Sequence, residues 1–279
     1  MVNKLGNKPL VGIGLRTPHY SHVIQNKPQI GWFEIHSENF FMQEGNSLHV
    51  LDTIRQDYPL SLHGVGLSLG STDELDKSHV QKIKSLLNRY TPFLVSEHLS
   101  WSKIDGIYFP DLLPIPYTEE SFSVFARNID YVQTILGREL LIENPSSYLE
   151  YKDSSLLEVD FLSNLCKKTG AKILLDLNNV YVSACNNDWD IKIYLDAIPP
   201  ELVEEIHLAG HEFRSFEDGS TLRIDTHASQ VCTEVWSLFN YSIKRGISAP
   251  TLIEWDTNIP DFEILMKEAT LAQTYLNSK

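Results

Sequence analysis

The sequence predicts an α/β protein built as a single (β/α)8 barrel, a TIM barrel, over residues 1–279. Three observations lead to this fold class. Eight short apolar runs are typical of buried strands, segments with helical spacing separate them, and the runs lack the clean alternation of half-exposed strands. Alternation of strand and helix implies a parallel sheet, and eight such units favour a closed barrel. An open, doubly wound sheet of eight parallel strands is the alternative.

The predicted strands are short, and most of them end in a carboxylate or an imidazole. They lie near residues 11–15, 32–36, 60–63, 93–98, 140–143, 173–176, 205–207 and 251–254. A parallel barrel carries its chemistry at the C-terminal ends of its strands. If all eight runs join one barrel, the polar residues that end them meet in a small space, which predicts a metal site.

Helical spacing of apolar residues predicts a helix after most of these strands. Thr118 is expected to cap the longest of them, because acidic residues follow it, and Gly137 is expected to end it. The expected helical segments cover residues 48–54, 76–90, 118–135, 154–169, 191–198, 231–244 and 260–276. Only the first crossover, roughly residues 18–28, is too poor in this pattern to predict a full helix.

Charge and cysteine usage exclude several classes of partner and site. A formal net charge of −14 argues against nucleic acid and against an anionic membrane surface, because neither attracts an acidic protein. Cys166, Cys185 and Cys232 are odd in number and form no CxxC pair, so we expect neither a disulfide framework nor a thiolate zinc site. Residues 1–8 contain no long apolar stretch, so we expect no signal peptide or transmembrane helix and a cytoplasmic location.

Candidate metal ligands end six of the predicted strands and occur in one loop. The strand-end candidates are His63, His98, Glu143, Asp176, His207 and Glu254. Asp225 and His227 lie two residues apart, and in an extended segment such residues point the same way. They could therefore coordinate one ion together. Asn179, three residues after Asp176, could place a side-chain oxygen nearby.

Each candidate taken alone also has a purely structural interpretation. A single strand-end histidine is more often a hydrogen-bonded structural residue, and a strand-end carboxylate often caps the next helix. The joint pattern favours a metal site, because four carboxylates within about 6 Å repel by roughly 3 kcal/mol per pair at an effective dielectric constant of about 20. Four carboxylates form six pairs, so the total repulsion is on the order of 17 kcal/mol, which is comparable to the net stability of a domain, about 5–15 kcal/mol. Imidazole and carboxylate donors without a thiolate suit iron, manganese or zinc.

Other strand-end residues are weaker candidates. They would lie in a substrate pocket or against the metal ligands, and they are His36, Glu38, Asn39 and His211. The remaining histidines lie in loop or helix patterns and are expected to face solvent. These are His19, His22, His49 and His79.

At these residues the chain resembles the DUF692 (UPF0276) family, the multinuclear non-haem iron-dependent oxidative enzymes (MNIO), which include oxidases of methanobactin biosynthesis. The resemblance covers about residues 10–270. The matching segments are GIGLRTPHY, SLHGVGLSLGS, LVSEHLSW, LLPIPYTEE, IENPSSYL, LLDLNNVYVSA, EIHLAGH, IDTH and LIEWD.

This resemblance implies a barrel similar to xylose isomerase that holds two or three iron ions in mixed Fe(II)/Fe(III) states, with O2 as co-substrate. It implies an oxidoreductase that modifies cysteine residues of a ribosomally synthesised (RiPP) precursor peptide. The products in such enzymes are oxazolone–thioamide or thiooxazole groups, or a shortened side chain. A small partner protein that binds the leader of the peptide often takes part.

The resemblance also implies how the ligands divide among the ions. One iron would be held by His63, His98 and Glu143. A second would be held by Glu143, Asp176, His207 and Glu254. A third would be held by Asn179, Asp225 and His227, together with Asp176.

Two other functions remain open at this point. One is a divalent-metal isomerase or phosphodiesterase of the xylose isomerase or endonuclease IV type, which would consume no oxygen. The other is a non-enzymatic metal-handling protein, which would need no open coordination position.

Overall fold

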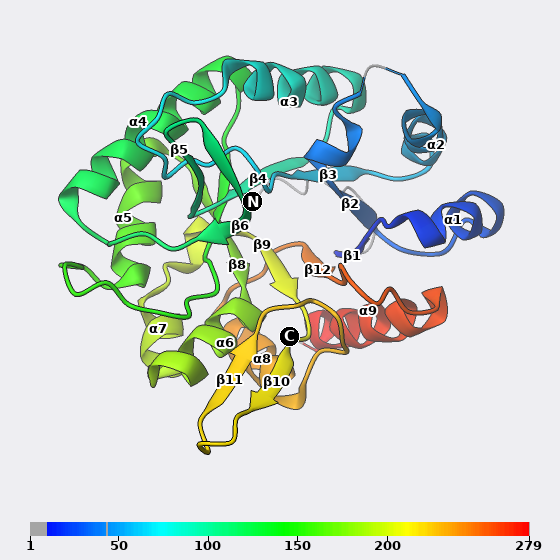
Figure 1. Cartoon of the computed structure of the whole chain (residues 1–279). Coiled ribbons are helices and arrows are strands. Elements are labelled where there is room, and N and C mark those ends of the chain that lie inside the picture. The colour runs from blue at the N-terminus through cyan, green and yellow to red at the C-terminus, as the bar shows by residue number, and fades with distance from the viewer. Residues whose placement is uncertain (1–9, 43, 279) are drawn as a thin grey trace.

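Eight parallel strands close into a barrel in the computed structural model, which describes residues 10–42 and 44–278 (Figure 1). The strands are β1 (Val11–Gly14), β2 (Trp32–His36), β3 (Leu60–His63), β4 (Leu94–His98), β7 (Leu141–Glu143), β8 (Lys172–Asp176), β9 (Val203–Leu208) and β12 (Thr251–Ile253). Their order around the barrel is β1-β12-β9-β8-β7-β4-β3-β2. The predicted closed barrel is therefore confirmed, and the open sheet is excluded. Residues 1–8, in which no signal peptide was expected, lie outside the described residues.

Helices surround this barrel (Figure 1). The α-helices are α1 (Tyr20–Asn26), α2 (Asn46–Arg55), α3 (Lys77–Tyr90), α4 (Glu119–Leu136), α5 (Glu158–Thr169), α6 (Leu177–Asn187), α7 (Ile191–Ala197), α8 (Thr233–Lys244) and α9 (Phe262–Asn277). Short 3-10 turns are η1 (Thr17–His19), η2 (Ser37–Phe40) and η3 (Pro200–Leu202). Within the described ranges, no helix combines the length and the apolar character needed to span a bilayer.

The ends of α4 form as the sequence predicts. The Thr118 hydroxyl accepts a hydrogen bond from the Ser121 backbone N–H, and the Ser121 hydroxyl accepts one from the Thr118 N–H. These reciprocal bonds satisfy two backbone donors that the first helical turn leaves free. Gly137 ends the helix in the left-handed conformation, with φ of 73°.

The helices differ from the predicted segments in two places. The first crossover does contain a helix, α1, which buries Val23 and ends where Lys27 adopts a left-handed conformation. The helix at residues 191–198 is not alone between its two strands, because α6 precedes it. The Asp176 carboxylate caps α6 by accepting a hydrogen bond from the Asn179 N–H at 2.6 Å. Sequence periodicity missed α6 because its buried residues include amides and a serine besides apolar side chains.

Two antiparallel hairpins lie outside the barrel and were not predicted. β5 (Trp101–Ile104) pairs with β6 (Ile107–Leu113) after β4, and β10 (Glu212–Ser215) pairs with β11 (Thr221–Ile224) after β9. Figure 1 shows β10 and β11 projecting from the body of the molecule. Each hairpin follows the C-terminal end of a barrel strand, so both stand at the end of the barrel where the candidate ligands lie.

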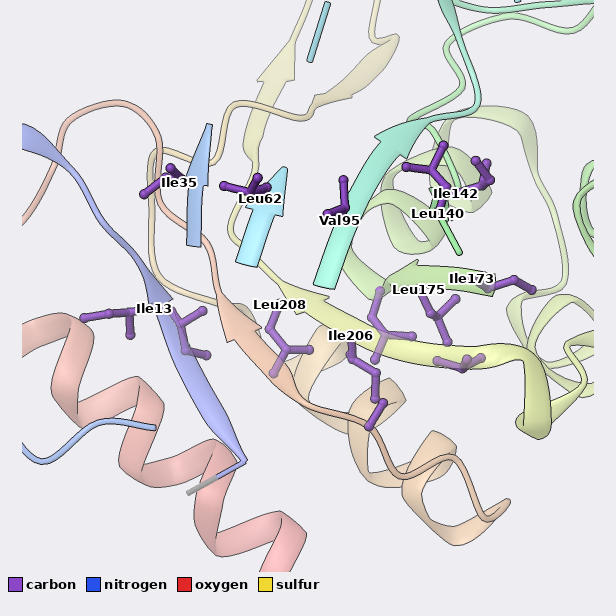
Figure 2. Packing of buried hydrophobic residues seen from close by; sticks show 14 of the residues in the cluster. Ile13, Ile35, Leu62, Val95, Leu140, Ile142, Ile173, Leu175, Ile206 and Leu208 are labelled. Carbon is purple, nitrogen blue, oxygen red and sulfur yellow. The ribbon is translucent and has the colours of Figure 1, made fainter. Parts of the chain in front are cut away.

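The barrel strands present two different faces. Outward-facing apolar side chains pack with the helices in the main core, and Figure 2 shows them on successive strands; they include Ile13, Ile35, Leu62, Val95, Ile142, Leu175 and Ile206. Inward-facing apolar side chains fill the N-terminal part of the barrel, and they are Trp32, Leu94, Leu141, Leu174 and Leu252. Gly12 makes room for this plug, because a Cβ there would lie 2.3 Å from the Trp32 ring.

Candidate metal centre

Inward-facing polar side chains lie directly above the apolar plug, because side chains two residues apart on a strand point to the same face. On β7, Glu143 follows Leu141 at this spacing, and on β8, Asp176 follows Leu174. The nine predicted ligands gathered by this geometry and by the loops above it are called the lumen cluster here. It comprises His63, His98, Glu143, Asp176, Asn179, His207, Asp225, His227 and Glu254.

The first part of the lumen cluster joins β3, β4 and β7. The Nε2 atoms of His63 and His98 lie 3.4 Å and 3.2 Å from Glu143 Oε2. Among the described residues that oxygen has no hydrogen-bond partner, although the side chain is buried. One ligand atom from each of the three residues lies within 4.8 Å of the others. The arrangement fits three ligands around one cation.

Neighbouring groups fix which nitrogen these two histidines offer. His98 Nδ1 lies 3.0 Å from the Gly64 carbonyl, which only accepts, so Nδ1 carries the proton. His63 Nδ1 lies 2.8 Å from the Ser96 hydroxyl, whose own proton is directed to the Leu62 carbonyl. Both rings therefore present an unprotonated Nε2 to Glu143, which is how outer partners orient metal-binding imidazoles.

Glu143 also belongs to a second group, with Asp176 and His207. Asp176 is held by reciprocal backbone hydrogen bonds with the Asn144 side chain at 2.9 Å, and its Oδ2 has no partner within the described part of the chain. His207 Nδ1 lies 3.0 Å from Glu254 Oε2, which adds a third carboxylate. Glu143 is therefore common to both groups.

The third predicted group is only partly assembled. His227 Nε2 lies 2.6 Å from Asp225 Oδ1, although the segment is not extended, because His227 adopts a left-handed φ of 44°. Asn179 turns instead toward Glu143, whose Oε1 accepts from its Nδ2 at 3.2 Å. The amide that reaches Asp225 belongs to Asn178, with Nδ2 2.8 Å from Asp225 Oδ1.

A cavity of about 220 Å³ opens above the lumen cluster. Its walls combine the strand ends with three loops, and they include His36, His63, His98, Asp111, Glu143, Ser146, Tyr148, Asn179, Asp225, His227, Glu254 and Asp256. Asp176 and His207 do not line it; both have an exposed fraction of 0%. The cluster thus has a buried floor and an accessible side.

The weaker candidates separate into two groups. His36 lines the cavity, and its Nε2 accepts from Arg16 Nη2 at 3.0 Å, because a guanidinium only donates. His211, Glu38 and Asn39 do not line it. His211 instead lies 2.9 Å from the Asn178 amide oxygen, and Asn39 is exposed.

The expectation that the remaining histidines face solvent is wrong for two of them. His19 is only 5% exposed, and its Nε2 lies 2.8 Å from the Pro260 carbonyl. His79 is partly buried, with its Nε2 3.1 Å from Glu38 Oε1. His22 stacks on Phe262, and His49 is exposed as expected.

Several polar residues around the cluster were missed by the sequence reasoning. Glu34 and Glu205 are fully buried, 3.5 Å and 3.8 Å from His207 Nε2. Asp256 pairs with Arg16 and lies 3.2 Å from His227 Nδ1. The sequence did carry a signal for these three acids. Each lies two residues from a strand-end candidate, and residues two apart on a strand face the same side of the sheet.

Burial sets the protonation of the first two groups. It lowers the pKa of His63 well below its usual range and that of His98 to about 4, so both rings are neutral at pH 7. It raises the pKa of Asp176 to about 7 and that of Glu143 well above its usual range. In the metal-free protein Glu143 therefore retains its proton and Asp176 is only partly ionised near pH 7, and a bound cation would displace these protons.

The two remaining histidines respond to their carboxylate neighbours. Burial opposes a charge on His207, but Glu34 and Glu254 raise its pKa well above the usual range. Burial likewise opposes a charge on His227, and Asp225 and Glu254 raise its pKa. These imidazolium–carboxylate pairs are the arrangement that metal-free ligands adopt when their charges must be balanced locally.

The donor set fits a group of hard or borderline metal ions. Imidazole nitrogens and carboxylate oxygens suit iron, manganese and zinc, and no cysteine belongs to the cluster. Buried atoms without hydrogen-bond partners in the described ranges include Glu143 Oε2, Asp176 Oδ2 and His207 Nε2. Such groups are costly to bury unless something binds them.

Comparison with known proteins identifies relatives over almost the whole chain. Residues 10–277 match the family described as "RiPP precursor modification enzyme MbnB/TglH/ChrH". A UPF0276 protein of Vibrio vulnificus (strain YJ016) is 47% identical over 270 residues, which cover 97% of this chain and 92% of the relative. A UPF0276 protein of Acaryochloris marina (strain MBIC 11017) is 46% identical over 265 residues, covering 95% and 94%.

Solved structures with little sequence similarity share the fold. A xylose isomerase-like TIM barrel protein from Mycobacterium smegmatis, in complex with magnesium, has a TM-score of 0.60 at 11% identity and covers 100% of this chain and 99% of its own. Endonuclease IV from Thermus thermophilus has a TM-score of 0.59 at 12% identity, covering 96% and 99%. These similarities confirm the predicted xylose isomerase-like barrel and show the fold alone.

Proposed function

The chain belongs to the family of RiPP precursor modification enzymes that it matches, and from this membership we propose that it is an iron- and dioxygen-dependent oxidoreductase that modifies cysteine residues of a precursor peptide. The observation that carries the proposal is the lumen cluster. Its imidazoles and carboxylates converge in overlapping groups that share Glu143. An overlapping set of this kind suits more than one metal ion.

The chain's own residues would hold two or three iron ions. The first position would be formed by His63, His98 and Glu143, and the second by Glu143, Asp176 and His207 together with Glu254, which lies beside His207. A third would rest on Asp225 and His227, with Asn179 reoriented from its contact with Glu143. Bound iron, in mixed Fe(II)/Fe(III) states, would supply the one-electron chemistry with O2 that side chains lack.

The cavity is small enough to favour a single side chain as the reacting group. Its volume of about 220 Å³ falls below the roughly 300–1,000 Å³ of typical small-molecule pockets. Tyr148 and Ser146 line it beside the ligands, and the Tyr148 hydroxyl accepts a hydrogen bond from the Asp225 N–H at 2.9 Å. A cysteine side chain of a peptide would enter here, and the surrounding loops would orient it and exclude water.

Arg16 and Asp256 would keep the edge of the cavity in place. Arg16 Nε donates to Asp256 Oδ1 at 3.0 Å, and its Nη2 donates to His36. Asp256 Oδ2 lies 3.2 Å from His227 Nδ1. These contacts would orient His36 and His227, which both line the cavity.

The proposed partners are a cysteine-containing precursor peptide and a small protein that binds its leader, as the family membership suggests. A cytoplasmic location belongs to the same proposal, because a reducing compartment keeps the substrate thiols reduced.

The proposal is tested by combining anaerobically iron-loaded protein with a short cysteine-containing peptide encoded beside its gene, and with any small protein encoded there. After O2 is admitted, we expect oxygen uptake and a change in the mass of the peptide. The peptide with serine in place of cysteine, and the Glu143→Gln protein, should give neither. Iron-loaded protein that leaves the peptide unchanged and consumes no oxygen would contradict the proposal.

The same assay separates the alternatives. An isomerase or phosphodiesterase would act without oxygen uptake, and a metal-handling protein would bind iron without changing the peptide. The net charge of −14 also weakens the case for a nucleic-acid substrate.

A further inference from the structure

A second group of potential ligands lies outside the barrel lumen. It joins Glu38 in η2, His79 in the first turn of α3 and Glu97 in β4, and we call it the wall cluster. Each residue offers one ligand atom, and these atoms lie within 4.8 Å of one another. Glu97 stands between Ser96 and His98, which face inward, so it faces outward, toward the helices. The wall cluster is therefore separate from the lumen cluster.

The buried carboxylate of Glu97 has no evident counter-charge. The residue is 2% exposed, and its Oε1 has no hydrogen-bond partner among the described residues. Glu38 Oε2 is also without a partner in that part of the chain. Over the same residues, the ion-pair contact of the cluster is that of Glu38 with His79, and neither carboxylate pairs with a lysine or arginine. A buried carboxylate beside a partly buried one, with a single imidazole, needs a cation or a proton to balance the negative charge.

The other oxygen of Glu38 is already committed. Glu38 Oε1 accepts hydrogen bonds from the backbone N–H groups of Val65 and Gly66, at 3.1 Å and 2.9 Å, and lies 3.1 Å from His79 Nε2. These bonds fix the carboxylate and leave Oε2 free. The position of Glu38 is thus set by the turn that follows β3.

Gly64 in this turn leaves room for the cluster. A Cβ at Gly64 would lie 1.8 Å from Glu97 Oε1, and no side chain could be accommodated there without moving the carboxylate. A Cβ at Gly66 would lie 3.4 Å from both Glu38 Oε1 and His79 Cε1, which is ordinary van der Waals contact. The side chains of His79 and Glu38 are 12% and 23% exposed, so an ion could enter from solvent while Glu97 forms the floor.

We propose that Glu38, His79 and Glu97 form a further metal site, which binds a divalent cation of the zinc or ferrous iron type. Imidazole nitrogens and carboxylate oxygens are both zinc ligands, and a zinc site with three protein ligands keeps a water in the fourth position. The bound ion would tie η2, α3 and β4 to the Gly64–Gly66 turn. That turn follows His63 directly, and its Gly64 carbonyl accepts a hydrogen bond from His98 Nδ1–H. The ion would therefore stabilise the backbone that orients two residues of the lumen cluster.

The test begins with crystals of the full-length wild-type protein grown with zinc, measured on both sides of the zinc absorption edge. We expect an anomalous peak between Glu38, His79 and Glu97, separate from any peak in the lumen. A map without a peak at these three residues would overturn the proposal and leave a shared proton as the means of balancing the two carboxylates.

Metal counting in solution gives an independent readout that does not depend on activity. After zinc loading and removal of free metal, His79→Ala and Glu97→Gln should each retain one ion per chain fewer than wild type. The exposed-histidine control His49→Ala should retain the wild-type number. Equal counts in wild type and both wall-cluster variants would refute the site. A double variant, Asp176→Ala with His207→Ala, should lose lumen ions but keep this one, so failure of the proposed function and failure of this site are distinguishable.

Discussion

The two faces of the barrel strands are equally buried but chemically opposite. On β7, Ile142 faces outward and Glu143 faces the lumen, with exposed fractions of 0% and 1%. Ile142 lies in the main apolar core, whereas Glu143 Oε2 has no hydrogen-bond partner among the described residues. The outward-facing side chains of each strand therefore stabilise the fold, and the inward-facing side chains at its C-terminal end carry the chemistry.

This difference indicates which buried residues are present for function. Burying an apolar side chain such as Ile142 stabilises the fold by about 1.5–3 kcal/mol. Burying a carboxylate without a partner opposes folding, so a chain selected for stability alone would place apolar residues in the lumen. Residues that break local rules in this way concentrate at functional sites.

The largest effect should come from removing the shared ligand. Glu143→Ala deletes the carboxylate that both ligand groups use, so we expect iron affinity to fall by more than roughly 100-fold, the upper end of what losing even an outer partner costs. Iron per chain after anaerobic loading measures this, and the far-UV spectrum should be nearly unchanged. The exposed Glu139→Ala is the matched control and should bind as wild type. Full iron content in Glu143→Ala would contradict the assignment of metal binding to the inward face of the strands.

The neighbouring outward residue should show the reverse behaviour. Ile142→Ala leaves a cavity between β7 and the helices, so we expect the free energy of unfolding to fall by about 2–5 kcal/mol. Urea denaturation measures the loss. Iron per folded chain should stay at the wild-type value, and a variant that lost iron without losing stability would contradict the assignment of this face to the fold.

Metal removal should destabilise the protein in a pH-dependent way. Burial raises the folded-state pKa of Asp176 to about 7, above its value in the unfolded chain. In protein freed of metal by a chelator, Asp176 contributes its full stabilisation only below about pH 3.9, the pKa of an aspartate in the unfolded chain. This contribution is lost as the pH rises through 7. Ions at 100 times their dissociation constant add about 2.7 kcal/mol.

The readout is the melting temperature with and without chelator between pH 6 and pH 8. Chelation should lower the melting temperature at both pH 6 and pH 8. The decrease should be larger at pH 8, where the metal ligands are also more fully deprotonated. A melting temperature that chelation leaves unchanged at both values would count against resident ions.

The smallest effect concerns a carboxyl buried outside the lumen. Burial between α9 and the segment before α8 raises the pKa of Glu268 to about 7, although its Oε1 accepts from the Val231 N–H at 3.0 Å. Its stabilising contribution is therefore lost as pH rises from about 4 to 7. Glu268→Gln keeps an acceptor and does not titrate. The free energy of unfolding of this variant, minus that of wild type, should therefore be greater at pH 8 than at pH 5, by on the order of 1 kcal/mol. Iron content should not change. A stability difference between the two proteins that is the same at pH 5 and pH 8 would contradict this ionisation.

The barrel could be predicted because its strands are short apolar runs with polar ends, and this signal is local. The helix α6 and the two hairpins were not predicted. α6 buries Asn178, Asn179 and Ser183 toward the centre, so its apolar periodicity is weak. The hairpins carry many exposed residues, so their strands lack the hydrophobic pattern that marks a buried one.

The candidate site was predictable where a strand ends in the lumen, and less so where contacts depend on loops. His63, His98 and Glu143 follow from strand position alone. Asn179 turns away from Asp225, and Asn178 takes that contact, because the capping of α6 by Asp176 fixes the rotation of the helix. The wall cluster joins residues from three separate elements, and no spacing in the sequence indicates that they meet.

The central claim is that the inward polar residues at the C-terminal end of the barrel hold a cluster of iron ions. Crystals of protein loaded with iron under anaerobic conditions, measured on both sides of the iron absorption edge, test it directly. We predict at least one strong anomalous peak within bonding distance of Glu143, together with His63 and His98 or with Asp176 and His207. A map of fully loaded protein with no iron peak among these side chains would contradict the account.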